Sequence, residues 1–176
     1  MKLEDLKGFK IPSAMIKKVF PPKKSVFTVD TDGDGKADSI KLVALNVVMP
    51  FNIPEKEDIG DINVDEIDPT KYGKILLDGE EIDISKGSNS IELIKQSLSV
   101  YHKKEKFSFD DALSGKMGGR TIAMGDEITV VFKLDESFIN KLTEGKHSLK
   151  VESEKIPSVE ISFELTDKNI NQKLDL

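Results

Sequence analysis

Nine consecutive residues constrain this chain more than any other stretch. From Asp30 to Asp38 the sequence reads Asp-Thr-Asp-Gly-Asp-Gly-Lys-Ala-Asp, with an aspartate at every odd position except the seventh. Four carboxylates this close repel one another, and a bound cation turns that repulsion into attraction. Calcium takes about six to eight oxygen ligands, from side chains at the first, third, fifth and ninth positions of such a loop and a backbone carbonyl at the seventh. The predicted ligands of Ca²⁺ are therefore Asp30, Asp32, Asp34, Lys36 and Asp38.

The spacing resembles the DxDxDGxxD loop of EF-hands, dockerin modules, thrombospondin type 3 repeats and integrin-like propeller blades. Gly35 occupies the sixth position, where the chain turns too sharply for a Cβ atom. The resemblance covers about a dozen residues, and it departs from the EF-hand at the twelfth position. Lys41 stands there in place of a bidentate glutamate, and an ammonium cannot bind a cation. The resemblance therefore implies modest affinity, with the missing oxygens supplied by water or by a distant carboxylate.

The residues on either side of the loop are typical of strands. Val26, Phe27 and Val29 precede it, and the apolar run 40–48 follows it. The sequence therefore predicts a turn between two strands, held by calcium. The alternative is an ordinary polar Gly/Asp turn that needs no ion.

A second acidic stretch repeats part of this pattern. Residues 61–68 place oxygen-bearing side chains at Asp61, Asn63 and Asp65, but Glu66 stands where the turn glycine belongs. This stretch is either a second metal loop or a solvated acidic loop, and it could also complete the first site.

Alternating apolar residues over much of the chain predict a mainly β fold. The clearest case is Val159, Ile161, Phe163 and Leu165, whose intervening residues are polar, as in a sheet with one buried face. The closing hairpin, 146–165, resembles the last third of an immunoglobulin-like domain, without the cysteines and tryptophan of antibody domains. The predicted fold is an immunoglobulin-like or jelly-roll-like β-sandwich with short helices.

Three segments follow from this pattern. Residues 1–24 form a basic N-terminal arm whose residues 11–20 have the spacing of a short amphipathic helix, ended by Pro21-Pro22. Residues 25–165 form the β-sandwich with its loop at 30–38. Residues 166–176 form a polar C-terminal tail, expected to be frayed.

Charge is distributed unevenly between these segments. The net charge is −6, yet the arm carries seven lysines against two acids, so the arm is about +5 and the remainder about −11. This asymmetry predicts self-association, in which the arm of one copy reaches the acidic body of the next. The acidic body disfavours nucleic acid, and no apolar run has the length of a membrane span.

Few residues have the spacing of a catalytic site. The chain has no cysteine and only two histidines, His102 and His147, which lie far apart in sequence. The predicted function is therefore a non-enzymatic, calcium-binding structural protein that assembles outside the cytoplasm, as part of a surface filament, an adhesive module or a virion. Two alternatives stay open: a carbohydrate- or ligand-binding module, and a hydrolase that uses acidic residues.

Overall fold

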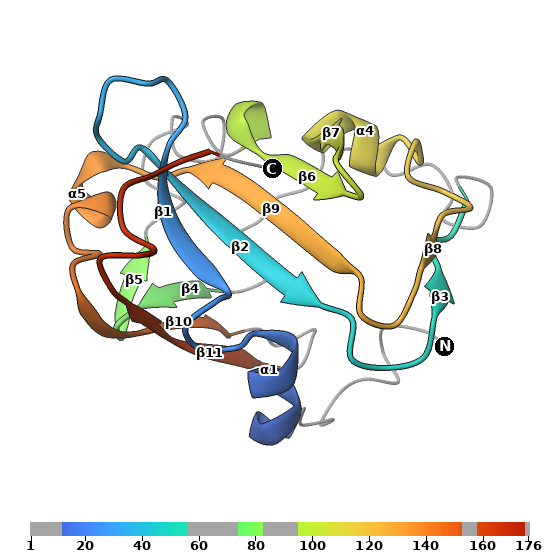
Figure 1. Cartoon of the computed structure of the whole chain (residues 1–176), viewed down its shortest axis with the longest axis horizontal. Coiled ribbons are helices and arrows are strands. Elements are labelled where there is room, and N and C mark those ends of the chain that lie inside the picture. Colours follow the sequence, from blue (N-terminus) through green and yellow to red (C-terminus); the bar gives the residue numbers. More distant parts are fainter. Residues whose placement is uncertain (1–11, 56–73, 83–94, 153–157, 175–176) are drawn as a thin grey trace.

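The computed structural model describes residues 12–55, 74–82, 95–152 and 158–174, and within them the protein is mainly β (Figure 1). One sheet has six strands in the order β12-β1-β2-β9-β6-β7. Its strands are β1 (Val26–Asp30), β2 (Ser39–Leu45), β6 (Ser99–His102), β7 (Glu105–Ser108), β9 (Glu127–Lys133) and β12 (Gln172–Lys173).

A second sheet has four antiparallel strands in the order β11-β10-β4-β5. Its strands are β4 (Lys74–Leu77), β5 (Glu80–Ile82), β10 (Gly145–Glu152) and β11 (Val159–Leu165). A separate pair joins β3 (Phe51–Asn52) to β8 (Thr121–Ile122). The short helices include α1 (Ser13–Val19), α4 (Phe109–Leu113) and α5 (Glu136–Ile139), and residues 95–97 are also helical.

The main hydrophobic core lies between the two larger sheets. Val26 and Ile40 project into it from the six-stranded sheet, and Leu77, Phe163 and Leu165 project into it from the four-stranded sheet. Each of these five side chains is no more than 3% exposed, so the two apolar faces exclude water from one another. The prediction of a mainly β sandwich with short helices is therefore confirmed.

The position of strand β2 in the sheet explains why its sequence is apolar on both faces. Ile40 and Leu42 face the main core, whereas Val43 projects from the opposite face. A second cluster of buried side chains, Val29 and Val131 with Tyr101, lies on that opposite face. Part of the opposite face is therefore covered as well, which accounts for the apolar residues on both sides of the central strands.

Local sequence signals correctly place several turns. Asp78 and Gly79 connect β4 to β5, and both have positive φ angles, 51° and 82°. This conformation is the one that an Asp-Gly hairpin turn requires. Asp135 caps α5, since its carboxylate accepts a hydrogen bond from the backbone N–H of Ser137 at 2.9 Å. The closing hairpin forms as predicted from β10 and β11.

The described part of the N-terminal arm packs on its own domain. Helix α1 contacts β11 and β2. The connection that follows it is bound to β11, because the backbone N–H of Glu164 donates to the carbonyl of Pro22 at 2.8 Å. Lys23 forms an ion pair with the Glu164 carboxylate at 3.6 Å. The predicted helix is therefore present, and the remainder of the arm, 1–11, lies outside the described residues.

The segment after residue 165 differs from the frayed tail that its polarity predicts. Strand β12 pairs in parallel with β1, with Val29 opposite Gln172 and Asp30 opposite Lys173. Asn169 anchors this segment, since its side-chain amide donates to the carbonyls of Val26 and Glu164. Asn169 is only 2% exposed. The C-terminal segment is therefore part of the six-stranded sheet, next to the acidic loop.

Within the described part of the chain, no helix is long and apolar enough to cross a membrane. The possible second metal loop at 61–68 lies outside the described residues.

Candidate metal centre

The acidic loop connects two paired strands, as its flanking residues predict. Strand β1 ends at Asp30 and β2 begins at Ser39, and the strands are antiparallel, with Val29 opposite Ser39. Two glycines in the loop, Gly33 and Gly35, have φ angles of 84° and 91°, which side-chain-bearing residues rarely adopt. The glycines therefore let the chain fold back over the end of β1.

This fold gathers three carboxylates. One oxygen from each of Asp30, Asp32 and Asp34 lies within 4.8 Å of the others, so that a single cation could contact all three. Asp30 is 7% exposed, whereas Asp32 and Asp34 lie at the surface. The structure thus brings together the residues predicted at the first, third and fifth positions of the loop.

Backbone N–H groups orient the Asp30 carboxylate. Its Oδ1 atom accepts from the N–H of Gly33 at 2.6 Å, and its Oδ2 atom accepts from the N–H of Gly35 at 2.9 Å. The hydrogen bond from Gly35 contributes most to lowering the pKa of Asp30 below its ordinary value of 3.8. Each carboxylate oxygen has two lone pairs, so the ionised Asp30 keeps acceptor capacity for a cation.

The two exposed carboxylates are held by the backbone immediately after them. Asp32 Oδ1 accepts from the N–H of Asp34 at 3.1 Å, and Asp34 Oδ1 accepts from the N–H of Lys36 at 2.8 Å. Each side chain thus stabilises the turn through one oxygen. The second oxygen of each carboxylate is left for solvent or a metal ion.

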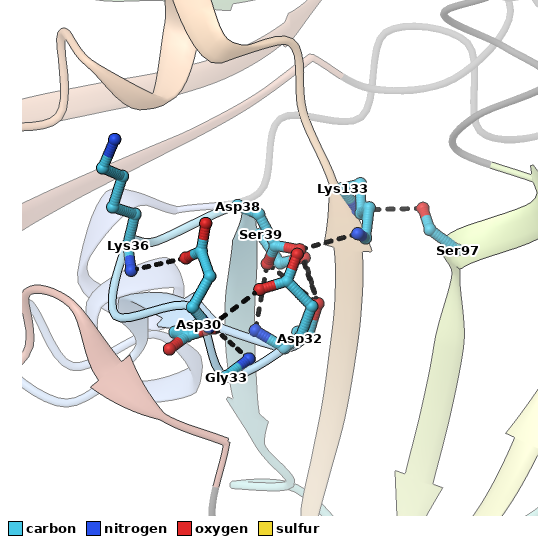
Figure 2. A network of polar contacts seen from close by, with 10 residues as sticks. Asp30, Asp32, Gly33, Lys36, Asp38, Ser39, Ser97 and Lys133 are labelled. Carbon is cyan, nitrogen blue, oxygen red and sulfur yellow. Dashed lines mark hydrogen bonds and ion pairs between the residues drawn. The ribbon is translucent and has the colours of Figure 1, made fainter.

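Asp38, the predicted ligand at the ninth position, is turned toward other partners (Figure 2). Its carboxylate accepts from the hydroxyl of Thr31 at 2.8 Å and forms an ion pair with Lys133 of β9 at 2.7 Å. Burial opposes ionisation of Asp38, but the hydrogen bonds from Lys133 and Thr31 outweigh it and lower its pKa. Asp38 therefore fixes the loop to β9, and a metal ion at the three-carboxylate cluster would reach Asp38 only through water or after a rearrangement.

The negative charge of the loop also acts on the side chain of Lys133. Its pKa is raised mainly by the hydrogen bond to Asp38, and the charges of Asp32 and Asp34 add to this effect. Its backbone N–H donates to the hydroxyl of Ser97 at 2.9 Å, which ties this point of β9 to the residues before β6 (Figure 2).

Lys36 is the predicted backbone ligand, and its side chain points away from the carboxylates (Figure 2). The atom of Lys36 that would bind the ion is therefore its carbonyl oxygen, as the seventh position of a calcium loop requires. The preceding carbonyl, that of Gly35, accepts a hydrogen bond from the side-chain amide of Asn171 at 2.8 Å. The C-terminal segment is thus hydrogen-bonded to the loop.

A cavity of about 360 Å³ adjoins the loop. Asp34 and Asp38 line it from the loop, and Glu136 lines it from the first turn of α5. Glu136 is therefore a carboxylate that lines the same cavity as Asp34, but it does not belong to the cluster whose oxygens lie within 4.8 Å of one another. Sequence reasoning missed it, because nothing local in the sequence shows that α5 lies beside the loop.

The two histidines occupy separate structural positions. The ring of His147 stacks on Phe163 with centroids 5.5 Å apart, while its two nitrogens contact Asp78 Oδ2 at 2.7 Å and the carbonyl of Thr143 at 2.8 Å. His102 is 3% exposed, and its Nε2 atom lies 3.1 Å from Asp126 Oδ2. Both rings therefore connect neighbouring segments of the fold.

Asp126 links the two turns at one end of the six-stranded sheet. Its Oδ2 atom contacts His102, accepts from the N–H of Ala123 at 2.9 Å and forms an ion pair with Lys103 at 3.1 Å. These contacts, with the His102 hydrogen bond as the largest cause, lower the pKa of Asp126 to about 2.

This depressed pKa predicts a loss of stability in acid. The unfolded Asp126 has a pKa of 3.8, so its stabilisation is fully present above that pH and is lost as the pH falls through about 2. We expect Asp126→Asn to lower the melting temperature at about pH 6, with the difference from the parent shrinking between about pH 4 and pH 2. Melting curves of both proteins across this range measure it, and an equal difference at every pH would contradict the prediction.

The chain matches no protein-family model and no curated protein sequence. The geometry of the acidic loop is therefore the basis on which a function can be assigned.

Proposed function

We propose that the loop 30–38 binds calcium and that the protein is a structural component whose fold this ion stabilises. The observation that carries the proposal is the convergence of Asp30, Asp32 and Asp34 within 4.8 Å. All three donors are hard carboxylate oxygens, and among the residues that the structure describes no nitrogen or sulfur ligand joins them, a donor set that suits calcium rather than zinc or copper.

The position of the loop explains how calcium would act on the fold. Asp30 ends β1 and the other two carboxylates follow it, while the same loop is attached to β9 through Lys133 and to the C-terminal segment through Asn171. An ion that removes repulsion among the carboxylates would therefore stabilise the meeting point of three chain segments. A ligand that binds only the folded state stabilises it in proportion to the logarithm of its concentration.

Exposed apolar residues support the second half of the proposal, assembly. Val48, Met49 and Phe51 follow β2, and Met124 follows β8, the partner of β3. Their exposed fractions reach 79% at Met49 and 68% at Met124. Neighbouring exposed apolar side chains of this size are typical of protein–protein contacts. A role in a surface filament, an adhesive module or a virion fits both halves, with the arm of one copy as a further contact.

Calorimetry tests the calcium site directly. Titration of calcium into the parent protein should give a saturable signal, and Asp32→Asn with Asp34→Asn should weaken the binding strongly, because two of the three charged ligands become neutral. Asparagine keeps the side-chain oxygens that accept from the loop N–H groups, so this double variant removes charge and leaves the turn intact. Asp110→Asn with Asp167→Asn changes the net charge equally at exposed acids outside the loop, and should bind calcium as the parent does. Equal binding by both double variants would rule out the site.

Light scattering tests assembly separately. We expect the particle size to increase in millimolar calcium, and the double variant Asp32→Asn with Asp34→Asn to need a higher calcium concentration for the same increase. A parent protein that binds calcium and remains a monomer would refute assembly and leave the metal site standing. Binding to a glycan array, or turnover of a glycoside, would instead favour one of the two alternatives.

A further inference from the structure

A basic cavity lies on the face of the six-stranded sheet opposite the main core. Its volume is about 640 Å³, within the usual range for ligand sites. We call it the lysine pocket, because Lys24, Lys41, Lys103 and Lys104 line it. These lysines come from the segment before β1, from β2 and from the turn between β6 and β7.

The lysine pocket has the opposite charge to the chain as a whole. Two acids, Asp126 and Glu127, also line it, so its formal charge is about +2 in a chain of net charge −6. The carboxylate of Asp126 already contacts Lys103 and His102. Within the described residues, Lys24 and Lys104 form no ion pair, and both lie at the surface. Their charges are therefore available to an anionic ligand.

The spacing of the lysines indicates an extended ligand. Lys41 on β2 lies two strands from β6 and is level with Ser99, whereas Lys103 follows β6 four residues further on, so the two lysines are separated by about 10 Å across the sheet and about 13 Å along it. Carboxylates on alternate residues of an extended peptide are about 7 Å apart and point to the same side. A peptide with several such carboxylates can meet these charges together, whereas a single small anion cannot.

The floor of the lysine pocket favours a peptide over a nucleic acid. Phe27, Val43 and Tyr101 give it an apolar surface. The ammonium of Lys41 lies 5.6 Å from the centre of the Phe27 ring, and that of Lys106 lies 6.0 Å from the Tyr101 ring. Bases bind to such surfaces by stacking on open ring faces, and here a cation already covers one face of each ring.

We propose that the lysine pocket binds an extended acidic segment of a partner protein, in which Asp or Glu occupies every second position. The carboxylates contact Lys24, Lys104 and their neighbours, and the methylene groups of the same acidic side chains lie on the apolar floor, while the residues between them point away from the sheet. Strands β1, β2, β9 and β6 form a rigid support for this contact. The site is separate from the acidic loop and does not depend on calcium.

A peptide titration tests this proposal on the full chain. Because the chain contains no tryptophan, the fluorescence anisotropy of a peptide Trp-Gly-Glu-Ile-Glu-Val-Glu-Ile reports binding directly. We expect a saturable rise that weakens with salt, as screening of exposed charges requires. Lys24→Gln with Lys104→Gln should weaken binding about tenfold. Lys146→Gln with Lys168→Gln, the same charge change at other exposed positions, should alter it less than about twofold.

Three results would overturn the proposal. The first is the absence of saturation at millimolar protein, and the second is an equal loss of affinity in the two double variants. The third is tighter binding of a single-stranded oligonucleotide with as many charges as the peptide, which would make this a polyphosphate site. Thermal melting of each variant ensures that the comparison is made between folded proteins.

Discussion

Calcium at about a hundred times its dissociation constant is expected to raise the melting temperature of this protein by about 5–10 °C. Binding at that ratio adds about 2.7 kcal/mol to the free energy of unfolding. For a chain of 176 residues, each kcal/mol corresponds to about 2–4 °C. Differential scanning calorimetry with calcium and with a chelator measures the difference.

The double variant Asp32→Asn with Asp34→Asn should show a much smaller rise of the melting temperature at the same calcium concentration, because the loss of two ligand charges weakens binding. In chelator it should melt at or above the parent temperature, because the repulsion among the loop carboxylates is reduced while their hydrogen bonds to the backbone remain. A calcium-dependent rise in this variant as large as that of the parent would locate the ion elsewhere.

Removal of the Phe163 ring is expected to destabilise the protein most. Phe163 is 3% exposed, lies in the core between the two sheets and stacks on His147. Phe163→Ala should therefore reduce the free energy of unfolding by about 3–5 kcal/mol, through lost burial and the cavity left behind. That is a large part of the total of about 5–15 kcal/mol that is typical of proteins. Urea denaturation followed by circular dichroism measures the change.

Two further variants test whether the loss of stability in Phe163→Ala comes from the packing of the buried ring. Phe163→Leu fills most of the space and should cost about 1–2 kcal/mol. Glu160→Ala changes the same strand on its exposed face, and should change stability by less than about 0.5 kcal/mol. Similar losses from all three variants would show that β11, rather than the buried ring, is the sensitive element.

The sequence predicts those features that depend on neighbouring residues. Alternation along β11, the Asp-Gly turn after β4 and the Asp135 cap of α5 each need only a few consecutive residues, and all three are present. The same holds for Asp30, Asp32 and Asp34, because a tight turn with two glycines cannot keep these side chains far apart. Short-range chemistry therefore predicts the centre of the candidate site.

The surroundings of the site depend on contacts between distant residues. The Lys133 partner of Asp38 is set by the pairing of β2 with β9, and the Asn171 partner of Gly35 is set by the parallel pairing of β12 with β1. Polar composition after residue 165 predicts a frayed tail, but the buried Asn169 side chain outweighs that tendency by satisfying two backbone carbonyls. No local pattern encodes these long-range partners.

The hydrogen bond between Asn171 and Gly35 has a consequence for biosynthesis. The two residues are 136 positions apart, so at about 5–20 residues per second the ribosome makes the loop roughly 7–27 s before its partner. During that interval β1 has an open edge where β12 will later pair, and such an edge can recruit strands from other nascent chains. The edge of β1 is therefore covered only after the C-terminal segment has been synthesised.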